Sequence, residues 1–335
     1  MITALYLSHF RNFSHRHLHF HKGLQAIVGP NTSGKTTILE ALYFASIGRS
    51  FKTQRPIDMI QYGTKAFVIE ISFIKDEIEQ NIRISYDEKY QKEIRYNQSR
   101  YTLFTPLLGI FPTVLSLPMD SKMIYGSSEE RRKFLNILLA QSHPVYVHHL
   151  NRYRKALMHR NALLKQNIRK TIEIWERELI QSGHYLQQQR SRSIDLLNRK
   201  VQTIYHHLFF STEEVLLVYR PSEATERDFN AIREKEILLG TTLIGAHKDD
   251  FLILIQGKSA KQFTSEGQKR TFLIILKLAE SSLLSSSLLL IDDFGIHLDK
   301  RRQQIIEQYL QEYPQVCITS PYCTQHISKN IFITE

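Results

Sequence analysis

The sequence predicts an α/β protein with two lobes, one built on a mixed sheet that includes antiparallel strands and one that is largely helical. Three observations predict this. A glycine-containing loop at 29–36 lies between a short apolar strand and a helix. A continuous apolar strand at 288–291 ends in two acidic residues. Between these two, the stretch from about 129 to 210 carries apolar residues at helical spacing.

The N-terminal part is expected to consist of short strands. Segments 2–7, 16–20, 67–73, 80–86 and 93–96 alternate apolar and polar residues at least in part, with polar turns between them, which is typical of antiparallel pairing. The histidines at 15, 17, 19 and 21 would share one strand face. That spacing fits a metal patch or a solvated face, and the lack of an accompanying carboxylate or cysteine favours the solvated face.

The loop at 29–36 fits the G-x-x-x-x-G-K-[ST] phosphate-binding pattern at every fixed position. A loop that runs from a strand into a helix directs backbone N–H groups and the helix N-terminus at one point, which suits a triphosphate. The pattern therefore predicts an ATP or GTP site. Its residues are Gly29, Pro30, Asn31, Thr32, Ser33, Gly34, Lys35 and Thr36.

The region after residue 105 contains three prolines, Pro106, Pro112 and Pro118. Prolines at this spacing are typical of a connecting segment, which indicates a domain boundary. The helical stretch that follows should break at Pro144 and at Gly183. We therefore predict an ATPase lobe formed by 1–105 and 286–335, with a helical lobe inserted at 106–285.

Two further motifs belong with the phosphate loop. Four apolar residues followed by Asp292 form the Walker B pattern, and Asp292 would share a Mg²⁺ ion with Thr36. Asp293 is the candidate general base, and Lys35 is the candidate contact for the β- and γ-phosphates.

About 25 residues before Asp292, an S-x-G-Q motif formed by Ser265, Gly267 and Gln268 lies ahead of a helix, which provides a second phosphate-binding end. By itself S-x-G-Q also fits a helix-capping turn; the order of the motifs favours the functional interpretation.

The net charge of the chain indicates which kind of molecule it is expected to bind. The chain has 335 residues and a formal net charge of +11, which favours a polyanion such as nucleic acid or an acidic membrane surface. Residues 129–200 hold most of this excess, with 15 Lys and Arg against 6 Asp and Glu. The basic helices are either a solvated face or a surface that contacts nucleic-acid phosphates. The candidate DNA-contacting residues are Arg49, Lys52, Arg152, Arg154 and Lys155.

The cysteine content and the first residues of the chain indicate a cytosolic protein without membrane association. The only two cysteines, Cys317 and Cys323, fit ordinary reduced thiols rather than a disulfide or metal framework. The first residues include His9 and Arg11 and lack the long apolar run of a signal peptide.

Taken together, these motifs resemble the RecF family of bacterial recombination mediators, whose relatives include the SMC heads. The resemblance runs nearly end to end. Besides the motifs above it includes 10–13 (FRNF), 48–51 (GRSF), 129–135 (EERRKFL), 153–157 (YRKAL), 160–165 (RNALLK) and 245–250 (GAHKDD). It implies an ABC-type ATPase head without a long coiled coil, and no heptad run of that length is present.

The resemblance also implies a function. ATP and Mg²⁺ would bind the phosphate loop of one subunit and Ser265 of a second would cap the nucleotide, which closes a homodimer around DNA at single- and double-stranded junctions or gaps. Slow, DNA-dependent ATP hydrolysis would release the dimer, so ATP acts as a switch. Partnership with RecR and RecO and delivery of RecA are implied by resemblance alone.

Two departures from the family pattern matter. Thr32 occupies a position where this family's phosphate loop usually has glycine; threonine is a poor fit if that position needs positive φ. Asp293 occupies the position where ABC transporters carry glutamate, and its shorter carboxylate is consistent with slow hydrolysis. The histidine that follows the last core strand in ABC ATPases is not evident; Thr319 or Ser320 lies there.

Three other function classes fit the motifs less well. A transporter nucleotide-binding subunit is the main alternative, and the basic helical insert and the 10–13 segment count against it. A structural chromosome protein of the SMC type would need long coiled coils. A small-molecule kinase would have no use for the S-x-G-Q motif.

Overall fold

The computed structural model describes residues 1–209, 214–263, 265–321, 327 and 330–333. The chain divides into two compact units, which are described separately. Unit 1 comprises Met1–Asp120, His207–Phe210 and Ser265–Glu335, and unit 2 comprises Ser121–His206 and Ser211–Thr264. Unit 2 is shorter at both ends than the predicted lobe at 106–285, because residues 106–120 and the helix that follows Ser265 belong to unit 1.

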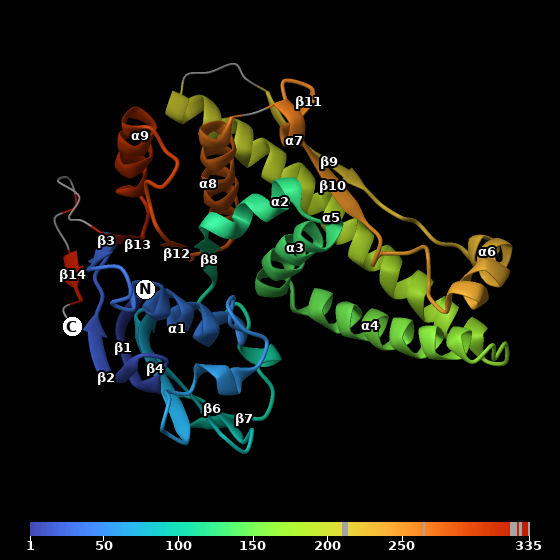
Figure 1. Ribbon diagram of the computed structural model, residues 1–335, viewed down its shortest axis with the longest axis horizontal. Coiled ribbons are helices and arrows are strands. Elements are labelled where there is room, and N and C mark those ends of the chain that lie inside the picture. Colours follow the sequence, from blue (N-terminus) through green and yellow to red (C-terminus); the bar gives the residue numbers. More distant parts are fainter. Residues whose placement is uncertain (210–213, 264, 322–326, 328–329, 334–335) are drawn as a thin grey trace. The chain divides into compact units, whose positions relative to one another are not determined.

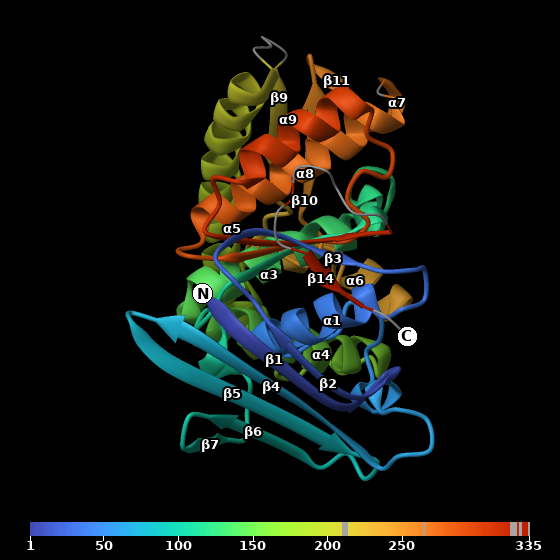
Figure 2. The ribbon, with the colours of Figure 1, turned by 90° about the vertical axis from the view of Figure 1, so that its left-hand side faces the viewer.

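Unit 1 contains an antiparallel sheet of six strands (Figure 2). Along β4, alternate residues from Phe67 to Phe73 are buried, as expected for a strand with one face on the core. The exposed histidines 15, 17 and 19 lie on the edge strand β2, in agreement with a solvated strand face, whereas the exposed His21 lies beyond the end of that strand. In spatial order the strands are β2 (Phe13–His19), β1 (Ile2–Phe10), β4 (Ala66–Lys75), β5 (Ile78–Asp87), β6 (Lys92–Tyr96) and β7 (Ser99–Tyr101).

The second sheet of unit 1 has five strands, all parallel to their neighbours. Parallel strands buried on both faces read as continuous apolar runs, which is why 288–291 could be recognised in the sequence. In spatial order they are β14 (Asn330–Phe332), β3 (Gly23–Val28), β13 (Gln315–Ser320), β12 (Leu288–Ile291) and β8 (Thr113–Ser116).

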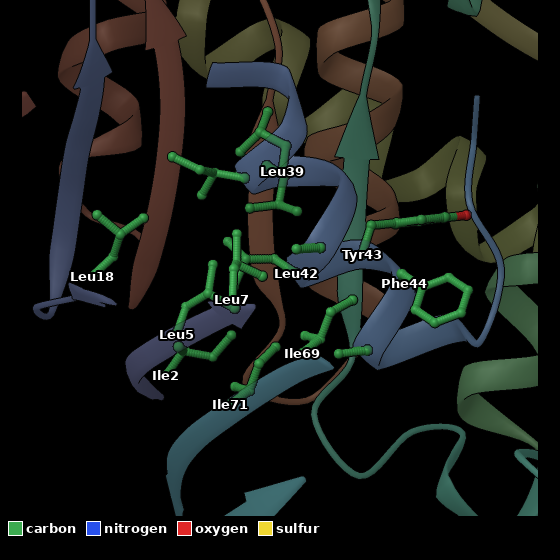
Figure 3. Packing of buried hydrophobic residues seen from close by; sticks show 14 of the residues in the cluster. Ile2, Leu5, Leu7, Leu18, Leu39, Leu42, Tyr43, Phe44, Ile69 and Ile71 are labelled. Atoms are coloured by element: carbon green, nitrogen blue, oxygen red, sulfur yellow. The ribbon is translucent and has the colours of Figure 1, made fainter. Parts of the chain in front are cut away.

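Helix α1 (Lys35–Ile47) contacts strands of both sheets, including β4 and β8. It is buried almost all round, which explains why it is apolar on nearly every face. Leu39, Leu42 and Phe44 pack with Leu5 and Ile71 of the antiparallel sheet (Figure 3). Helices α8 (Glu266–Leu283) and α9 (Lys300–Leu310) lie on the other side of the parallel sheet (Figure 1). Short 3-10 helices are η1 (Pro56–Met59), η2 (Thr105–Leu107) and η3 (Pro118–Ser121).

Unit 2 is largely helical, with a three-stranded antiparallel sheet in the order β11-β10-β9. The helical stretch breaks at Pro144, as predicted, but its second break lies at 166–171 and not at Gly183. A Cβ on Gly183 would lie 3.1 Å from the Tyr153 ring, so this glycine permits close packing between its own helix and the helix that carries Tyr153. The elements are α2 (Lys122–Tyr125), α3 (Ser128–Ser142), α4 (Pro144–Lys165), α5 (Ile172–Phe209), β9 (Val215–Arg220), α6 (Glu226–Leu239), β10 (Asp250–Ile255), β11 (Lys258–Ser259) and α7 (Ala260–Phe263).

Candidate functional site

The phosphate-binding loop connects β3 to α1 at the carboxyl edge of the parallel sheet. Lys35 is buried, and its ammonium group donates to the carbonyl oxygens of Gly29 and Pro30, both at 2.7 Å. The Ser33 hydroxyl is buried without a hydrogen-bond partner among the described residues. A cation held across the loop and an unsatisfied donor beside it are features expected of an anion-binding cradle.

Close packing shapes this loop from two sides. A Cβ on Gly34, whose φ is 98°, would lie 2.5 Å from the Phe13 ring and 2.7 Å from the Asn12 side-chain nitrogen. A Cβ on Gly29 would lie 2.7 Å from the carbonyl oxygen of Ile333. The 10–13 segment and the chain after β14 therefore both abut the loop, and its two fixed glycines have no room for a side chain.

Thr32 has a φ of 77°, so this position does need the positive φ at which threonine fits poorly. A β-branched residue is strained there, whereas glycine is not. The Thr32 hydroxyl donates to the carbonyl oxygen of Asn31, which satisfies it locally.

The phosphate loop and the Walker B strand meet although they are far apart in the sequence. The Thr36 hydroxyl lies 3.0 Å from both carboxylate oxygens of Asp292. Asp292 is 5% exposed, and burial raises the pKa of its carboxyl group, with the Asp293 charge acting in the same direction. Hydrogen bonds from Thr319 and Thr36 oppose that rise. A hydroxyl and a carboxylate so placed are oxygen ligands of the kind that Mg²⁺ prefers.

Thr319 is a site residue that the sequence analysis named without giving it a role. Its hydroxyl donates to Asp292 at 2.8 Å and accepts from the backbone N–H of Asp293 at 2.7 Å. Asp293 has a φ of 50°, so its backbone leaves the strand sharply at this point. Because β13 and β12 are parallel neighbours, the end of β13 had to fall beside Asp292, which is the signal that could have identified Thr319.

The S-x-G-Q motif starts α8 in the same unit as the phosphate loop. It forms a reciprocal capping box: Ser265 Oγ accepts from the N–H of Gln268, and the Gln268 side chain accepts from the N–H of Ser265. The motif therefore caps the N-terminus of α8, as the helix-capping interpretation expects. A Cβ on Gly267 would lie 3.3 Å from the guanidinium of Arg302, which follows the N-cap Asp299 of α9.

The small basic loop after α1 is tied to a buried carboxylate. Glu40 of α1 is fully buried, and Arg11 donates to both of its oxygens, at 3.0 and 2.6 Å. Lys52 lies 3.8 Å from the same carboxylate, with 37% of its side chain exposed, and Arg49 is exposed. Two of the proposed DNA contacts thus lie at the surface of unit 1.

The other proposed DNA contacts lie on α4. Arg152, Arg154 and Lys155 are exposed, and Arg152 forms an ion pair with Glu178. Arg160 of the same helix is fully buried and pairs with two glutamates, so it contributes to the core of unit 2 rather than to a surface.

The 245–250 segment is also structural. Asp249 is fully buried and accepts hydrogen bonds from Arg190, Tyr219 and Gln187. His247 accepts from Tyr153 and donates to the carbonyl oxygen of Thr242, and burial lowers its pKa to about 4. The segment organises the polar core of unit 2.

Further observations concern metals, thiols and membranes. In the part of the chain that the structure describes, no group of three or more His, Cys, Asp or Glu is placed to hold a metal ion. Burial raises the pKa of the free thiol Cys317 to about 12; Cys323 lies outside the described residues. No helix among the described residues is long and apolar enough to cross a bilayer.

Comparisons with known proteins agree with this arrangement. The family model described as "RecF/RecN/SMC N terminal domain" matches residues 1–330. The "DNA replication and repair protein RecF" of Protochlamydia amoebophila is 38% identical over 352 residues, covering 99% of this chain and 98% of that protein. The protein of the same name from Chlamydia trachomatis serovar L2 is 34% identical and covers 98% of this chain and 94% of its own length.

Solved structures show the same fold. The chain matches the recombination mediator RecF with bound ATP at a TM-score of 0.85 and 28% identity, covering 97% of this chain and 92% of that one. An SMC head bound to a domain of ScpA matches at a TM-score of 0.56 and 19% identity, with 95% of this chain and 89% of that one covered, which supports the fold alone. The predicted ABC-type head with a helical second lobe is confirmed. The chain belongs to the RecF family of DNA replication and repair proteins.

Proposed function

We propose that this chain is an ATP-dependent DNA-binding protein of recombinational gap repair, in which ATP acts as the switch. The observation that carries the proposal is the contact between Thr36 and Asp292, 256 residues apart, at the sheet edge where the phosphate loop begins. The solved RecF structures with ATP or an ATP analogue support ATP as the ligand, and both are of recombination mediators of the RecFOR pathway.

The residues present fit ATP and Mg²⁺. The loop 29–36 would surround the triphosphate, with Lys35 exchanging its two carbonyl partners for phosphate oxygens. Thr36 and Asp292 would hold the Mg²⁺ ion, which supplies charge neutralisation for the phosphates when bound. Asp293 would polarise the attacking water, with its backbone held by Thr319.

The S-x-G-Q motif, which is the signature motif of ABC-type ATPases, supports a homodimer as the active form. Ser265, Gly267 and Gln268 form a helix N-terminus that would cap the nucleotide bound by a second copy. ATP binding would then close the dimer on DNA and slow hydrolysis would release it. Arg49, Lys52, Arg152, Arg154 and Lys155 are the proposed contacts to DNA phosphates.

RecO and RecR are the proposed protein partners, because the solved RecF relative acts in the RecFOR pathway. Delivery of RecA to gapped DNA would be the downstream result. The alternative, a transporter nucleotide-binding subunit, finds no support in the relatives reported above.

Fluorescence anisotropy on labelled gapped duplex tests this proposal, with and without ATP and Mg²⁺, for wild type and Lys35→Ala. We expect tight, salt-sensitive binding that requires ATP and is lost in the variant. Binding that is independent of ATP would remove ATP as the switch. No binding at moderate salt would remove DNA as the ligand.

A further inference from the structure

One arginine of α8 is buried against the strand end that carries Asp292. The Arg270 guanidinium donates from Nη1 to the carbonyl oxygen of Leu117 at 2.9 Å and from Nη2 to that of Asp292 at 3.3 Å. Arg270 is 5% exposed, and its Nε has no hydrogen-bond partner among the described residues. Within that part of the chain no carboxylate oxygen lies at ion-pair distance from it. Backbone oxygens, rather than a counter-ion, hold this cation.

Arg270 is rigidly joined to the signature motif. It lies five residues after Ser265 in the same helix, and the Thr271 hydroxyl donates to the carbonyl oxygen of Gly267. Because an α-helix keeps a fixed rise and rotation per residue, a displacement of the motif displaces Arg270 with it.

Asp292 is held from the other side by the neighbouring strand. Its backbone N–H donates to the carbonyl oxygen of Ser116 at 2.9 Å, and its own carbonyl oxygen accepts from Arg270. Its carboxylate accepts from Thr36 and Thr319. Arg270 is therefore the link by which α8 reaches the main chain of the proposed Mg²⁺ ligand and the end of β8 at once.

We propose that Arg270 is a positioning residue that couples the signature motif to the alignment of Asp292. The inference deepens the proposed function and rests on it. When Ser265 caps the nucleotide held by a second copy, α8 and Arg270 shift together, and the carbonyl groups of Asp292 and Leu117 follow. The unpaired Nε permits a second arrangement, in which it pairs with one of the three aspartates whose charges already act on the guanidinium, Asp120, Asp292 and Asp293.

Two variants test this: Arg270→Met removes the donors and Arg270→Lys keeps the charge with a single donor atom. Nucleotide affinity is measured with a fluorescent ATP analogue in EDTA, and dimer formation is measured by sedimentation velocity with ATP and Mg²⁺. For Arg270→Met we expect affinity in EDTA within about twofold of wild type, since the residue does not touch the loop, and dimerisation weakened roughly 5- to 150-fold, the usual span of coupling between sites. Arg270→Lys should recover part of the loss.

Arg131→Met is the matched control. Arg131 of unit 2 is also largely buried and donates to two carbonyl oxygens, those of Met123 and Gly126; unlike Arg270 it also pairs with a carboxylate, that of Asp250. Its loss should lower the melting temperature without weakening ATP-driven dimerisation. Wild-type dimerisation in Arg270→Met would overturn the inference, as would an equal fall in affinity in EDTA, which indicates a merely structural role. Should Arg270→Met fail to fold, an unchanged Arg270→Lys overturns it. If wild type itself neither binds ATP nor dimerises with it, the proposed function fails instead.

Discussion

Thr32 illustrates how a single side chain can act against its backbone. With φ at 77°, the residue occupies the left-handed region, which disfavours β-branched side chains. We expect Thr32→Gly to raise the free energy of unfolding by up to about 1 kcal/mol, because the relief of strain exceeds the extra entropy that glycine gives the unfolded chain. Urea denaturation followed by circular dichroism measures this.

Thr102→Gly is the control for Thr32→Gly. Thr102 is also an exposed loop threonine, but its φ is not positive. Its replacement should lower the free energy of unfolding by about 0.5–1 kcal/mol, the entropic effect alone. Equal destabilisation by the two changes would show that Thr32 is not strained.

His247 predicts a pH dependence of stability at the residue scale. Burial lowers its pKa from 6.5 to about 4, and its Nδ1 accepts a hydrogen bond from Tyr153, which only the neutral ring can do. Between these two pKa values the unfolded chain binds a proton that the folded chain does not. Stability from this residue is complete above pH 6.5 and is lost as the pH falls toward 4, by roughly 3 kcal/mol at most.

Urea denaturation of wild type and His247→Gln at several pH values isolates this effect, because other titrating groups cancel in the difference. The advantage of wild type should shrink as the pH falls from 6.5 to 4. A difference that is constant over this range would contradict the assignment of a buried neutral ring.

At the scale of one element, α4 combines structural and exposed cations. Arg160 is fully buried between Glu176 and Glu236, whereas Lys155 is exposed on the same helix. Arg160→Met should lower the free energy of unfolding by about 3–5 kcal/mol, because Glu236 stays buried without a cation and Glu176 keeps only its pair with Arg233. Lys155→Met should change it by less than about 0.5 kcal/mol.

For DNA binding, the two variants should differ in the opposite way: the change at Lys155 should have the larger effect. Lys155→Met should reduce the slope of log K against log salt by about one unit, as expected for one lost phosphate contact. Arg160→Met should leave that slope unchanged at a temperature where the variant is folded. A reduced slope for Arg160→Met with normal stability would show that its burial does not hold in solution.

For the whole molecule, the two-unit division predicts that nucleotide stabilises one unit selectively. The phosphate loop, Asp292 and the signature motif all belong to unit 1. ATP with Mg²⁺ at about 100 times its dissociation constant should stabilise that unit by roughly 2.7 kcal/mol. Hydrogen exchange should slow in α1 and around β12 and stay unchanged in α4 and α6, and EDTA should reverse part of the protection.

Lys35→Ala is the control for nucleotide stabilisation and should show none of it. Equal protection of α4 and α6 by ATP in wild type would mean that the two units do not respond independently.

Several elements could not be predicted, for reasons that lie in the packing. β8 is only four residues long, lies between Pro112 and Pro118 and is buried on both faces, so its sequence shows no alternation that would predict a strand. α5 continues through Gly183 because that glycine faces the Tyr153 ring, which is a property of the contact and not of the local sequence.

The sequence by itself determined the elements whose signal is local: the phosphate loop with its flanking strand and helix, the acidic end of 288–291, and the capped helix at Ser265. Residue type and spacing suffice there, because backbone geometry repeats over a few residues. Only the tertiary structure decided that Thr319 bridges Asp292 and Asp293, that Arg160 and Asp249 are buried in ion pairs, and that Arg270 joins α8 to Asp292. Burial and the choice of partner depend on segments far apart in the chain, and no short stretch of sequence contains both members of such a pair.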